Sequence, residues 1–277
     1  DEEMERLGAS VNAATWLDYT FYTTTVAVDA LDRVFELEAD RFGALAIEPA
    51  AFAAERDVVA NERRQVVDAN PDARLSEAFH SLALRGTPYA WPTIGWAHDI
   101  EAYTVEKLTA FYRRAYAPAN VCAVVCGAVD PSRVVEQLER RFGRLPGGAA
   151  LPRAPAMPLA AATVRLRERL PIQSRRLLMA WPAPARDDGA RPAWRMFTEI
   201  FGAAESSRLP RRLESRDRLV LDVSCDAYPF RLPSLFEVSA NLRRGVGEKR
   251  VIAAIEEELR RVAEDGVTDE EIEGARA

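Results

Sequence analysis

A stretch rich in proline and glycine interrupts the 277-residue sequence near its middle. Residues 145–159 hold four prolines and two glycines and show no hydrophobic periodicity, which is typical of a linker between domains. The chain is also longer than the usual single domain of about 100 to 200 residues. The sequence therefore predicts two domains, residues 1–145 and 161–277, joined by a linker at 146–160.

Both halves alternate strand-like and helical runs, which predicts an α+β fold. Pro49 and Thr104 are favourable helix-start residues, and Pro71 is expected to end the helix that begins at Pro49. Residues 121–129 are continuously apolar, which is typical of a strand buried on both faces. Strands are expected at 10–12, 20–28, 121–129, 163–170, 175–181, 219–228 and 234–242, and helices at 2–7, 29–42, 49–70, 75–84, 104–116, 131–143, 191–201, 248–264 and from 268 onward.

Composition excludes several classes of protein. Apolar residues make up 48% of the chain and charged residues 29%, as in ordinary globular proteins and unlike disordered or disulfide-scaffold chains. The net charge of 37 − 43 = −6 argues against nucleic-acid binding by phosphate neutralisation. No apolar run approaches the roughly 18 residues of a membrane span. The three cysteines, Cys122, Cys126 and Cys225, have spacings that predict neither a disulfide scaffold nor a zinc knuckle.

The two ends of the sequence have the pattern of helices that continue beyond it. Residues 2–7 have the pattern of the end of a helix, and residues 272–277 show no helix-stop signal. No signal-peptide pattern is present at the start. We therefore expect a fragment of a longer chain, and the sequence leaves a cytoplasmic or periplasmic location open.

Two glutamates on the second predicted helix are candidates for chemistry. Glu55 and Glu62 are seven residues apart, so two helical turns bring them to nearly the same face with about 10.5 Å of rise between them. Val58 and Val59 lie between them, which predicts a buried face carrying two carboxylates that need a cation. The alternative is that both glutamates are solvated and pair with the neighbouring Arg56 and Arg63.

The predicted hairpin near the start carries small and polar residues at its inner positions, residues 12–22. An ordinary edge hairpin explains this pattern. The functional alternative is an edge strand that pairs with an extended peptide.

Short motifs follow one another in order along nearly the whole chain. They are Asn12-Ala13-x-Thr15, Asp18-x-Thr20-x-Tyr22, Glu55-Arg56-x-Val58-Val59-x-x-Glu62, Asp68-x-Asn70-Pro71, Phe111-Tyr112-x-x-x-Tyr116-x-Pro118-x-Asn120, Gly127-x-Val129-Asp130-Pro131 and Ser206-Ser207-Arg208-Leu209. This series resembles the pitrilysin/insulinase family of zinc metallopeptidases, in its processing-peptidase-like branch.

The resemblance implies two homologous metallohydrolase-like α+β domains, each an antiparallel sheet packed with helices and each incomplete here. It implies a zinc-dependent endopeptidase that hydrolyses peptides or unfolded segments through metal-bound water, with one Zn²⁺. Glu62 takes the position of the zinc-ligating glutamate and Glu55 that of the acidic residue supporting it. Asn12, Ala13 and Thr15 take the positions that lie along the substrate backbone. The implied partners are a peptide substrate and a second subunit, in a homodimer or a heterodimer with a related chain.

The family's H-x-x-E-H zinc motif does not occur in the 277 residues. The two histidines, His80 and His98, lack its spacing and are expected to be structural or surface residues. The fragment is therefore expected to be inactive by itself, with the motif just upstream of Asp1. Two other interpretations stay open: a non-catalytic partner or scaffold subunit of the same fold, and a plain α+β protein with solvated glutamates.

Overall fold

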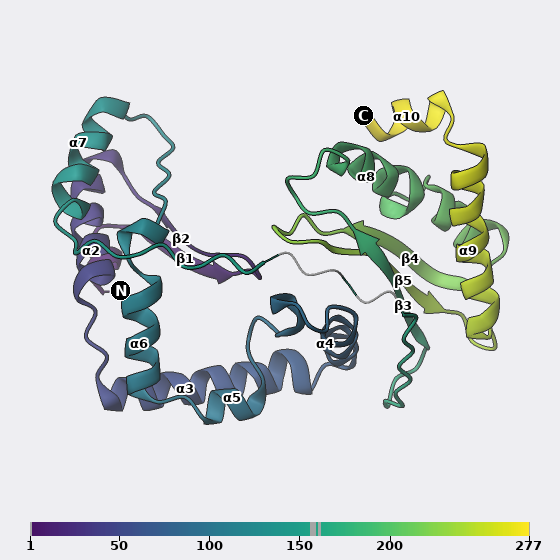
Figure 1. Cartoon of the computed structure of the whole chain (residues 1–277), viewed down its shortest axis with the longest axis horizontal. Coiled ribbons are helices and arrows are strands. Elements are labelled where there is room, and N and C mark those ends of the chain that lie inside the picture. The colour runs from purple at the N-terminus through teal and green to yellow at the C-terminus, as the bar shows by residue number, and fades with distance from the viewer. Residues whose placement is uncertain (1, 156–158, 160–161, 277) are drawn as a thin grey trace. The chain divides into compact units, whose positions relative to one another are not determined.

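The computed structural model describes residues 2–155, 159 and 162–276. Residues 156–158 and 160–161, which fall in the predicted linker and at the start of the second predicted domain, lie outside the described residues. The chain forms two compact units (Figure 1). The first comprises residues 1–63 and 93–154, and the second comprises residues 64–92 and 155–277.

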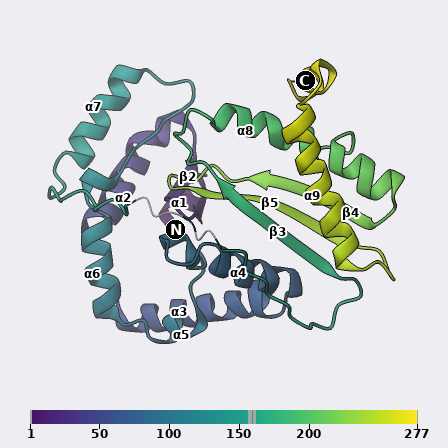
Figure 2. The same cartoon turned by 45° about the vertical axis from the view of Figure 1, so that its right-hand side comes forward.

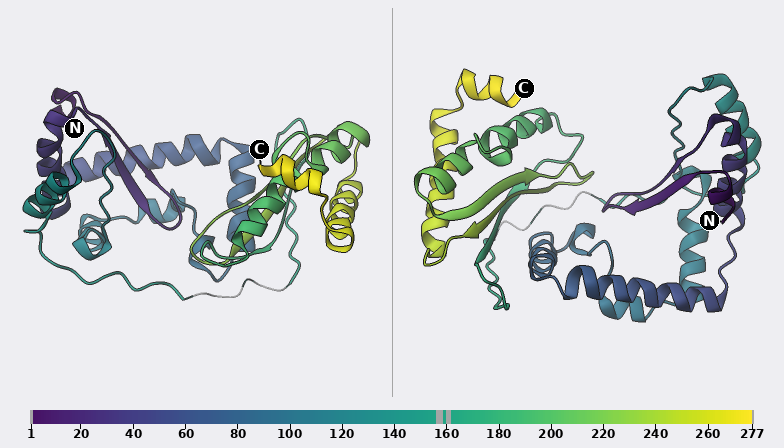
Figure 3. Two further views of the ribbon diagram at one scale, coloured as in Figure 1. Left: turned by 90° about the horizontal axis from the view of Figure 1, so that it is seen from above. Right: turned by 180° about the vertical axis from the view of Figure 1, so that it is seen from behind.

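The first unit begins with a short helix and a hairpin. Helix α1 (Glu2–Arg6) precedes strands β1 (Ser10–Thr15) and β2 (Thr20–Thr25), which pair antiparallel along their whole length (Figure 3). The turn between them is closed by the Trp16 N–H, which donates to the Tyr19 carbonyl at 2.8 Å. The strands are rich in threonine and aromatic residues, which suit a pleated surface. The predicted hairpin is confirmed.

The other regular elements of the first unit are helical, and α2 packs against α7. Asp32 of α2 receives hydrogen bonds from Arg140 and Arg141 of α7, each at 2.7 Å. The predicted cap Thr104 accepts from the Lys107 N–H at 3.3 Å and is confirmed. The elements are η1 (Val28–Ala30), α2 (Leu31–Ala44), α3 (Pro49–Arg63), α5 (Ala97–Glu101), α6 (Val105–Ala115), η4 (Pro118–Asn120) and α7 (Pro131–Phe142).

The strand predicted at residues 121–129 is wrong. The segment has no regular secondary structure, and Val124 within it is 81% exposed. A strand needs hydrogen-bonded neighbours, and within the described residues this segment pairs with neither β1 nor β2. Apolar composition alone therefore did not decide its conformation.

The second unit includes a helical segment from the first half of the sequence. A π-helical turn η2 (Arg64–Asp68) follows α3 directly, and helix α4 (Pro71–Ala83) and turn η3 (Pro88–Ala90) come next. Asn70 caps α4 by accepting from the backbone N–H groups of residues 72 and 73. Pro71 is the first residue of α4, so this helix starts four residues earlier than predicted.

A three-stranded antiparallel sheet forms the centre of the second unit. Its order is β3 (Arg176–Ala183), β5 (Ser234–Leu242), β4 (Val220–Ala227), so the last strand in sequence lies in the middle. Three of the four strands predicted in this part of the chain, at 175–181, 219–228 and 234–242, are confirmed. The strand predicted at residues 163–170 is wrong: the segment is exposed and irregular, with no ladder partner in the described sheet.

One face of this sheet builds the main hydrophobic core. Phe236, Val238 and Ala240 of β5 pack with Phe201 and Ile255 from the covering helices, all of them 1% exposed or less. Burial of such aromatic and branched side chains is the main stabilising contribution to a domain. Figure 2 shows the helices alongside the sheet. They are α8 (Arg191–Thr198), η5 (Glu199–Ala203), η6 (Pro210–Arg216), α9 (Glu248–Asp265) and α10 (Asp269–Arg276).

Helix α4 is tied to the central strand of the same sheet through a buried ion pair. Glu237 alternates along β5 with the core residues, and its side chain is only 10% exposed. His80 of α4 contacts it with Nε2 at 2.6 Å from Oε1, while its Nδ1 lies 2.8 Å from the Ser76 carbonyl oxygen. Burial lowers the pKa of His80, but the hydrogen bond and charge of Glu237 outweigh it, so the pKa lies above its usual value.

This pair predicts a pH-dependent stability of the second unit. Because the pKa of His80 is higher in the folded state than in the unfolded chain, its protonation stabilises the fold. This stabilisation is fully present at pH values below the unfolded-state pKa of about 6.5, and it is lost as the pH rises through the folded-state pKa. Glu237→Gln is expected to lower the free energy of unfolding by about 1.5–3 kcal/mol at pH 6, the usual worth of a hydrogen bond to a charged group. Urea unfolding of the wild-type chain and the Glu237→Gln variant at pH 6 and pH 9 measures this loss of stability. An equal cost at the two pH values would contradict the assignment.

Candidate metal and substrate site

The two candidate glutamates lie on α3 with both carboxylates exposed to solvent. Neither Glu55 nor Glu62 has a hydrogen bond or ion pair among the described residues. The neighbouring arginines are engaged elsewhere: Arg56 lies 3.8 Å from Asp57, and Arg63 donates to a backbone carbonyl. The alternative interpretation is therefore correct in one part only. Both carboxylates are exposed to solvent, but neither pairs with these arginines.

The prediction that this face of α3 is buried is wrong for the described structure. Val58 is 56% exposed, and Glu55 and Glu62 beside it are exposed as well. Helix α3 packs against α5, and Arg63 is the residue that this helix buries. Within the part of the chain that the structure describes, no element covers the face carrying the two glutamates.

Zinc accepts carboxylate oxygens as ligands, usually in a tetrahedral set with histidine or cysteine. Glu62 fits one position of such a set, because its carboxylate is unpaired and it sits on a regular helix. The described residues do not complete the set: they contain no group of three or more His, Cys, Asp and Glu side chains able to hold a metal ion. Within these residues Glu62 by itself does not form a metal site.

The predicted substrate residues all lie on β1. Strand β1 pairs with β2 on one edge, and its other edge has no partner strand in the described structure. The Asn12 Oδ1 accepts the Ala13 backbone N–H at 2.8 Å, and the Thr15 Oγ1 lies 3.1 Å from the Thr20 Oγ1. An unpaired strand edge of this kind can accept an extended peptide through main-chain hydrogen bonds.

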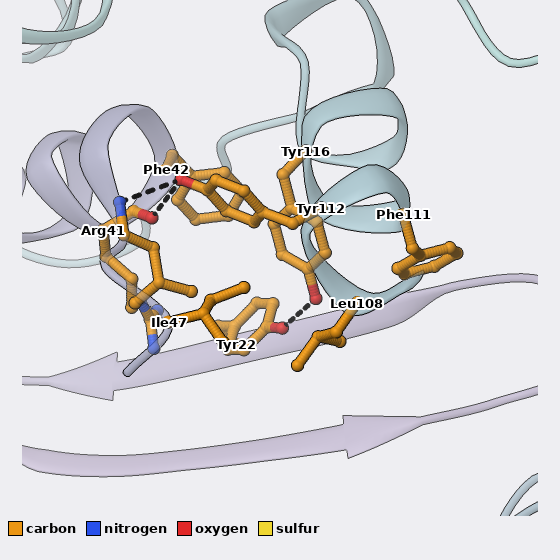
Figure 4. Close-up of a pocket in the computed structure, with 9 residues that line it drawn as sticks. Tyr22, Arg41, Phe42, Ile47, Leu108, Phe111, Tyr112 and Tyr116 are labelled. Carbon is orange, nitrogen blue, oxygen red and sulfur yellow. Dashed lines mark hydrogen bonds between the residues drawn. The ribbon is translucent and has the colours of Figure 1, made fainter. Parts of the chain in front are cut away.

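A hollow of about 180 Å³ in the first unit is lined by aromatic side chains (Figure 4). The Tyr22 and Tyr116 hydroxyls hydrogen-bond each other. The Tyr112 hydroxyl donates to the Arg41 carbonyl at 2.8 Å. The lining residues come from β2, α2, α6 and the segments after the two helices: Tyr22, Arg41, Phe42, Leu45, Ile47, Leu108, Phe111, Tyr112 and Tyr116.

The chemistry of this hollow is structural. Burial and the Tyr116 hydroxyl raise the pKa of Tyr22 above its usual range, so the phenol stays protonated at neutral pH. The Arg41 guanidinium lies 4.4 Å from the centroid of the Tyr22 ring, a cation–π contact. The hollow contains none of the candidate glutamates. We interpret it as the packing that fixes β2 against α2 and α6.

The histidines and cysteines have the roles expected from the sequence. His80 is held in the ion pair with Glu237, and the side chain of His98 is 78% exposed. Cys122 and Cys126 are exposed free thiols. Cys225 is buried and free, and burial raises its pKa to about 12. None of them contributes to a metal site within the described residues.

Sequence reasoning missed the aromatic hollow and the buried Arg63. The hollow had a signal in the sequence, the four-residue spacing of Tyr112 and Tyr116 at the end of α6, because residues four apart lie on the same side of a helix. Arg63 had none, since its burial depends on the carbonyl of Gly95, which is 32 residues away in the chain.

Two family models match successive parts of the chain. The model described as "Insulinase (Peptidase family M16)" matches residues 1–96, and "Peptidase M16 inactive domain" matches residues 102–277. The chain belongs to peptidase family M16. The resemblance noted from the motifs is confirmed, and so is the α+β fold.

Curated relatives of this M16 chain include zinc proteases. Zinc protease PqqE of Helicobacter pylori is 34% identical over 145 residues, covering 52% of this chain and 33% of the relative. An uncharacterized zinc protease of Streptomyces coelicolor is 27% identical over 277 residues, covering 97% and 60%. Cytochrome b-c1 complex subunit 1 of Rattus norvegicus is 25% identical over 142 residues, covering 51% and 29%. The M16 chain thus spans a third to three fifths of the length of the two zinc proteases.

A solved structure of similar fold is the crystal structure of a protease from Helicobacter pylori. It has a TM-score of 0.89 and 25% identity, and the match covers 99% of this M16 chain and 67% of that one. Within residues 2–155, 159 and 162–276, none of the helices combines the length and hydrophobicity needed to cross a membrane.

Proposed function

We propose that this M16 chain is part of a zinc-dependent endopeptidase that hydrolyses extended peptides or unfolded segments. The observation that carries the proposal is the state of Glu62: its carboxylate is exposed and unpaired although two arginines follow it directly. A carboxylate left free beside cations is suited to a metal ligand. Membership of the M16 family and the zinc-protease names of its relatives support the proposal.

The proposed ligand set is Glu62 together with two histidines of an H-x-x-E-H segment encoded upstream of Asp1. One Zn²⁺ held there would supply a Lewis acid that polarises the scissile carbonyl and activates water. Glu55 lies two helical turns before Glu62 on the same helix face. It is proposed to support the site by orienting a metal ligand without binding the metal itself. The domain division at 146–160 remains a proposal alongside this assignment.

Substrate is proposed to bind as an added strand on the free edge of β1. The Ala13 N–H is held by Asn12 Oδ1, which occupies the place of a peptide carbonyl. An entering substrate carbonyl would replace that oxygen and release the Asn12 amide to bind the substrate backbone. Thr15, at the end of β1, would lie alongside the same extended chain. Binding through main-chain hydrogen bonds depends on the extended conformation of the peptide more than on its sequence.

The coding sequence immediately upstream of Asp1 tests the ligand set. An in-frame H-x-x-E-H within the family's helix position is expected. A continuous reading frame without this motif would overturn the catalytic assignment, and Glu62 would then have no zinc to bind.

A second candidate function is a non-catalytic partner subunit of the same fold. The observation that favours it is the relative named as a subunit of the cytochrome b-c1 complex. Such a subunit would bind a related M16 chain, in a homodimer or a heterodimer, without holding zinc. Zinc content of the full-length protein distinguishes the two candidates, since the partner subunit is expected to be isolated metal-free.

A further inference from the structure

Helix α3 buries a charged residue where an apolar one would be expected. Arg63, its last residue, is 6% exposed, whereas Val58 on the same helix is 56% exposed. A buried guanidinium is costly unless it is hydrogen-bonded or stacked. Its location therefore indicates a specific set of contacts, and the residue before it is the proposed zinc ligand Glu62.

Two contacts of Arg63 lie on the segment that leads into α5. Its Nη1 donates to the Gly95 carbonyl oxygen at 2.5 Å, and its guanidinium carbon lies 5.9 Å from the centroid of the Trp96 ring. Gly95 adopts φ +85°, a conformation that favours glycine. The turn that presents this carbonyl thus depends on a glycine, and the arginine joins the end of α3 to residues 95–96.

The end of α3 is also where the regular helix stops. The residues after Arg63 form the π-helical turn η2, so the α-helical hydrogen-bond pattern does not continue beyond Glu62 and Arg63. Among the described residues the Glu62 side chain has no polar partner. The backbone of the last α-helical turn therefore sets the point and direction at which the Glu62 side chain leaves the helix, and Arg63 joins that turn to Gly95.

We infer that Arg63 is a positioning residue for the metal ligand Glu62, acting through its hydrogen bond to the Gly95 carbonyl and its contact with Trp96. The inference rests on the proposed function, since it needs Glu62 to bind zinc. Arg63 touches neither metal nor substrate. Its role is to fix the backbone that aims the Glu62 carboxylate.

The test measures zinc affinity of the full-length protein by competition with a chelating dye. Arg63→Met, which removes both contacts, is expected to weaken zinc binding about 10-fold, at the lower end of the effect of losing a residue that orients a ligand. Arg63→Lys keeps a donor for the Gly95 carbonyl and is expected to restore most of the affinity. Arg56→Met, on the same helix seven residues earlier, is the matched control and should bind zinc as wild type does.

The outcomes distinguish the positioning role of Arg63 from the metal-ligand role of Glu62. If Glu62→Gln loses zinc but Arg63→Met binds it normally, the positioning role is wrong and the ligand assignment stands. If Glu62→Gln keeps zinc, the assignment of Glu62 as a metal ligand fails, and the inference that rests on it fails with it. Thermal unfolding monitors folding of each variant. If Arg63→Met does not fold, Arg63→Gln, a shorter neutral side chain, replaces it, and an unchanged zinc affinity there would overturn the inference.

Discussion

Full-length protein carrying Glu62→Gln is expected to be isolated without bound zinc. The neutral amide is a much weaker ligand than the carboxylate, and the exposed position of Glu62 leaves no neighbouring described carboxylate to replace it. The loss of affinity should exceed the roughly 10- to 100-fold that loss of an outer supporting residue causes. Metal analysis by atomic absorption on the purified protein measures it.

Glu55→Gln is the matched control for this experiment. It makes the same chemical change on the same exposed face of α3, seven residues earlier. We expect this variant to lose more peptidase activity than zinc affinity, because Glu55 supports the site without binding the metal. Wild-type zinc content in Glu62→Gln would refute the ligand assignment, and loss of zinc in Glu55→Gln with retention in Glu62→Gln would reverse the two roles.

Arg212→Met is expected to lower the free energy of unfolding of the second unit by about 3–5 kcal/mol, the usual cost of breaking a buried ion pair. Arg212 on η6 and Glu258 on α9 are both about one-tenth exposed or less, and Nη1 lies 2.7 Å from the Glu258 carboxylate. The same nitrogen donates to the Ala254 carbonyl at 3.2 Å. Without the arginine, the Glu258 carboxylate stays buried without this partner.

Arg261→Met is the control for the Arg212 experiment. Arg261 contacts the same two glutamates, Glu257 at 2.8 Å and Glu258 at 3.3 Å, but its side chain is 47% exposed. Solvent screening limits such a pair to about 0–1 kcal/mol. Urea unfolding of the 277-residue chain compares the variants. Equal losses for Arg212→Met and Arg261→Met would show that burial does not set the strength of this cluster.

The sequence predicted helices and their caps well where the signals are local. Thr104 caps its helix as its side chain suggests, since an N-cap interaction spans three residues. The β4 and β5 strands were predicted from hydrophobic alternation. The start of α4 was placed four residues late, because Asn70-Pro71 was interpreted as the end of one helix when it is also the cap and first residue of the next.

Two strand predictions failed for a reason that sequence patterns do not contain. Residues 121–129 and 163–170 have strand-like composition, but a strand forms only with hydrogen-bonded neighbours. Those neighbours are set by tertiary structure, and none is present for these segments among the described residues. The first of these runs is continuously apolar and the second alternates apolar with charged residues, so neither pattern by itself predicts a strand that lacks a partner.

The candidate site was predictable in part. The seven-residue spacing correctly placed Glu55 and Glu62 on one helical face, because that spacing is fixed by helix geometry. The burial of that face was not predictable, since it depends on which elements cover α3. The ion pair of His80 with Glu237, 157 residues apart, was equally invisible in the sequence, although its histidine was expected to be structural.

Zinc dependence of peptide cleavage by the full-length protein is the most direct test of the account. A quenched fluorescent peptide is incubated with the protein as isolated, after removal of metal by a chelator, and after addition of Zn²⁺. We predict cleavage that disappears on metal removal and returns with about one equivalent of zinc, and none by the 277-residue chain alone. Cleavage that persists without zinc, or that survives in Glu62→Gln, would contradict the account.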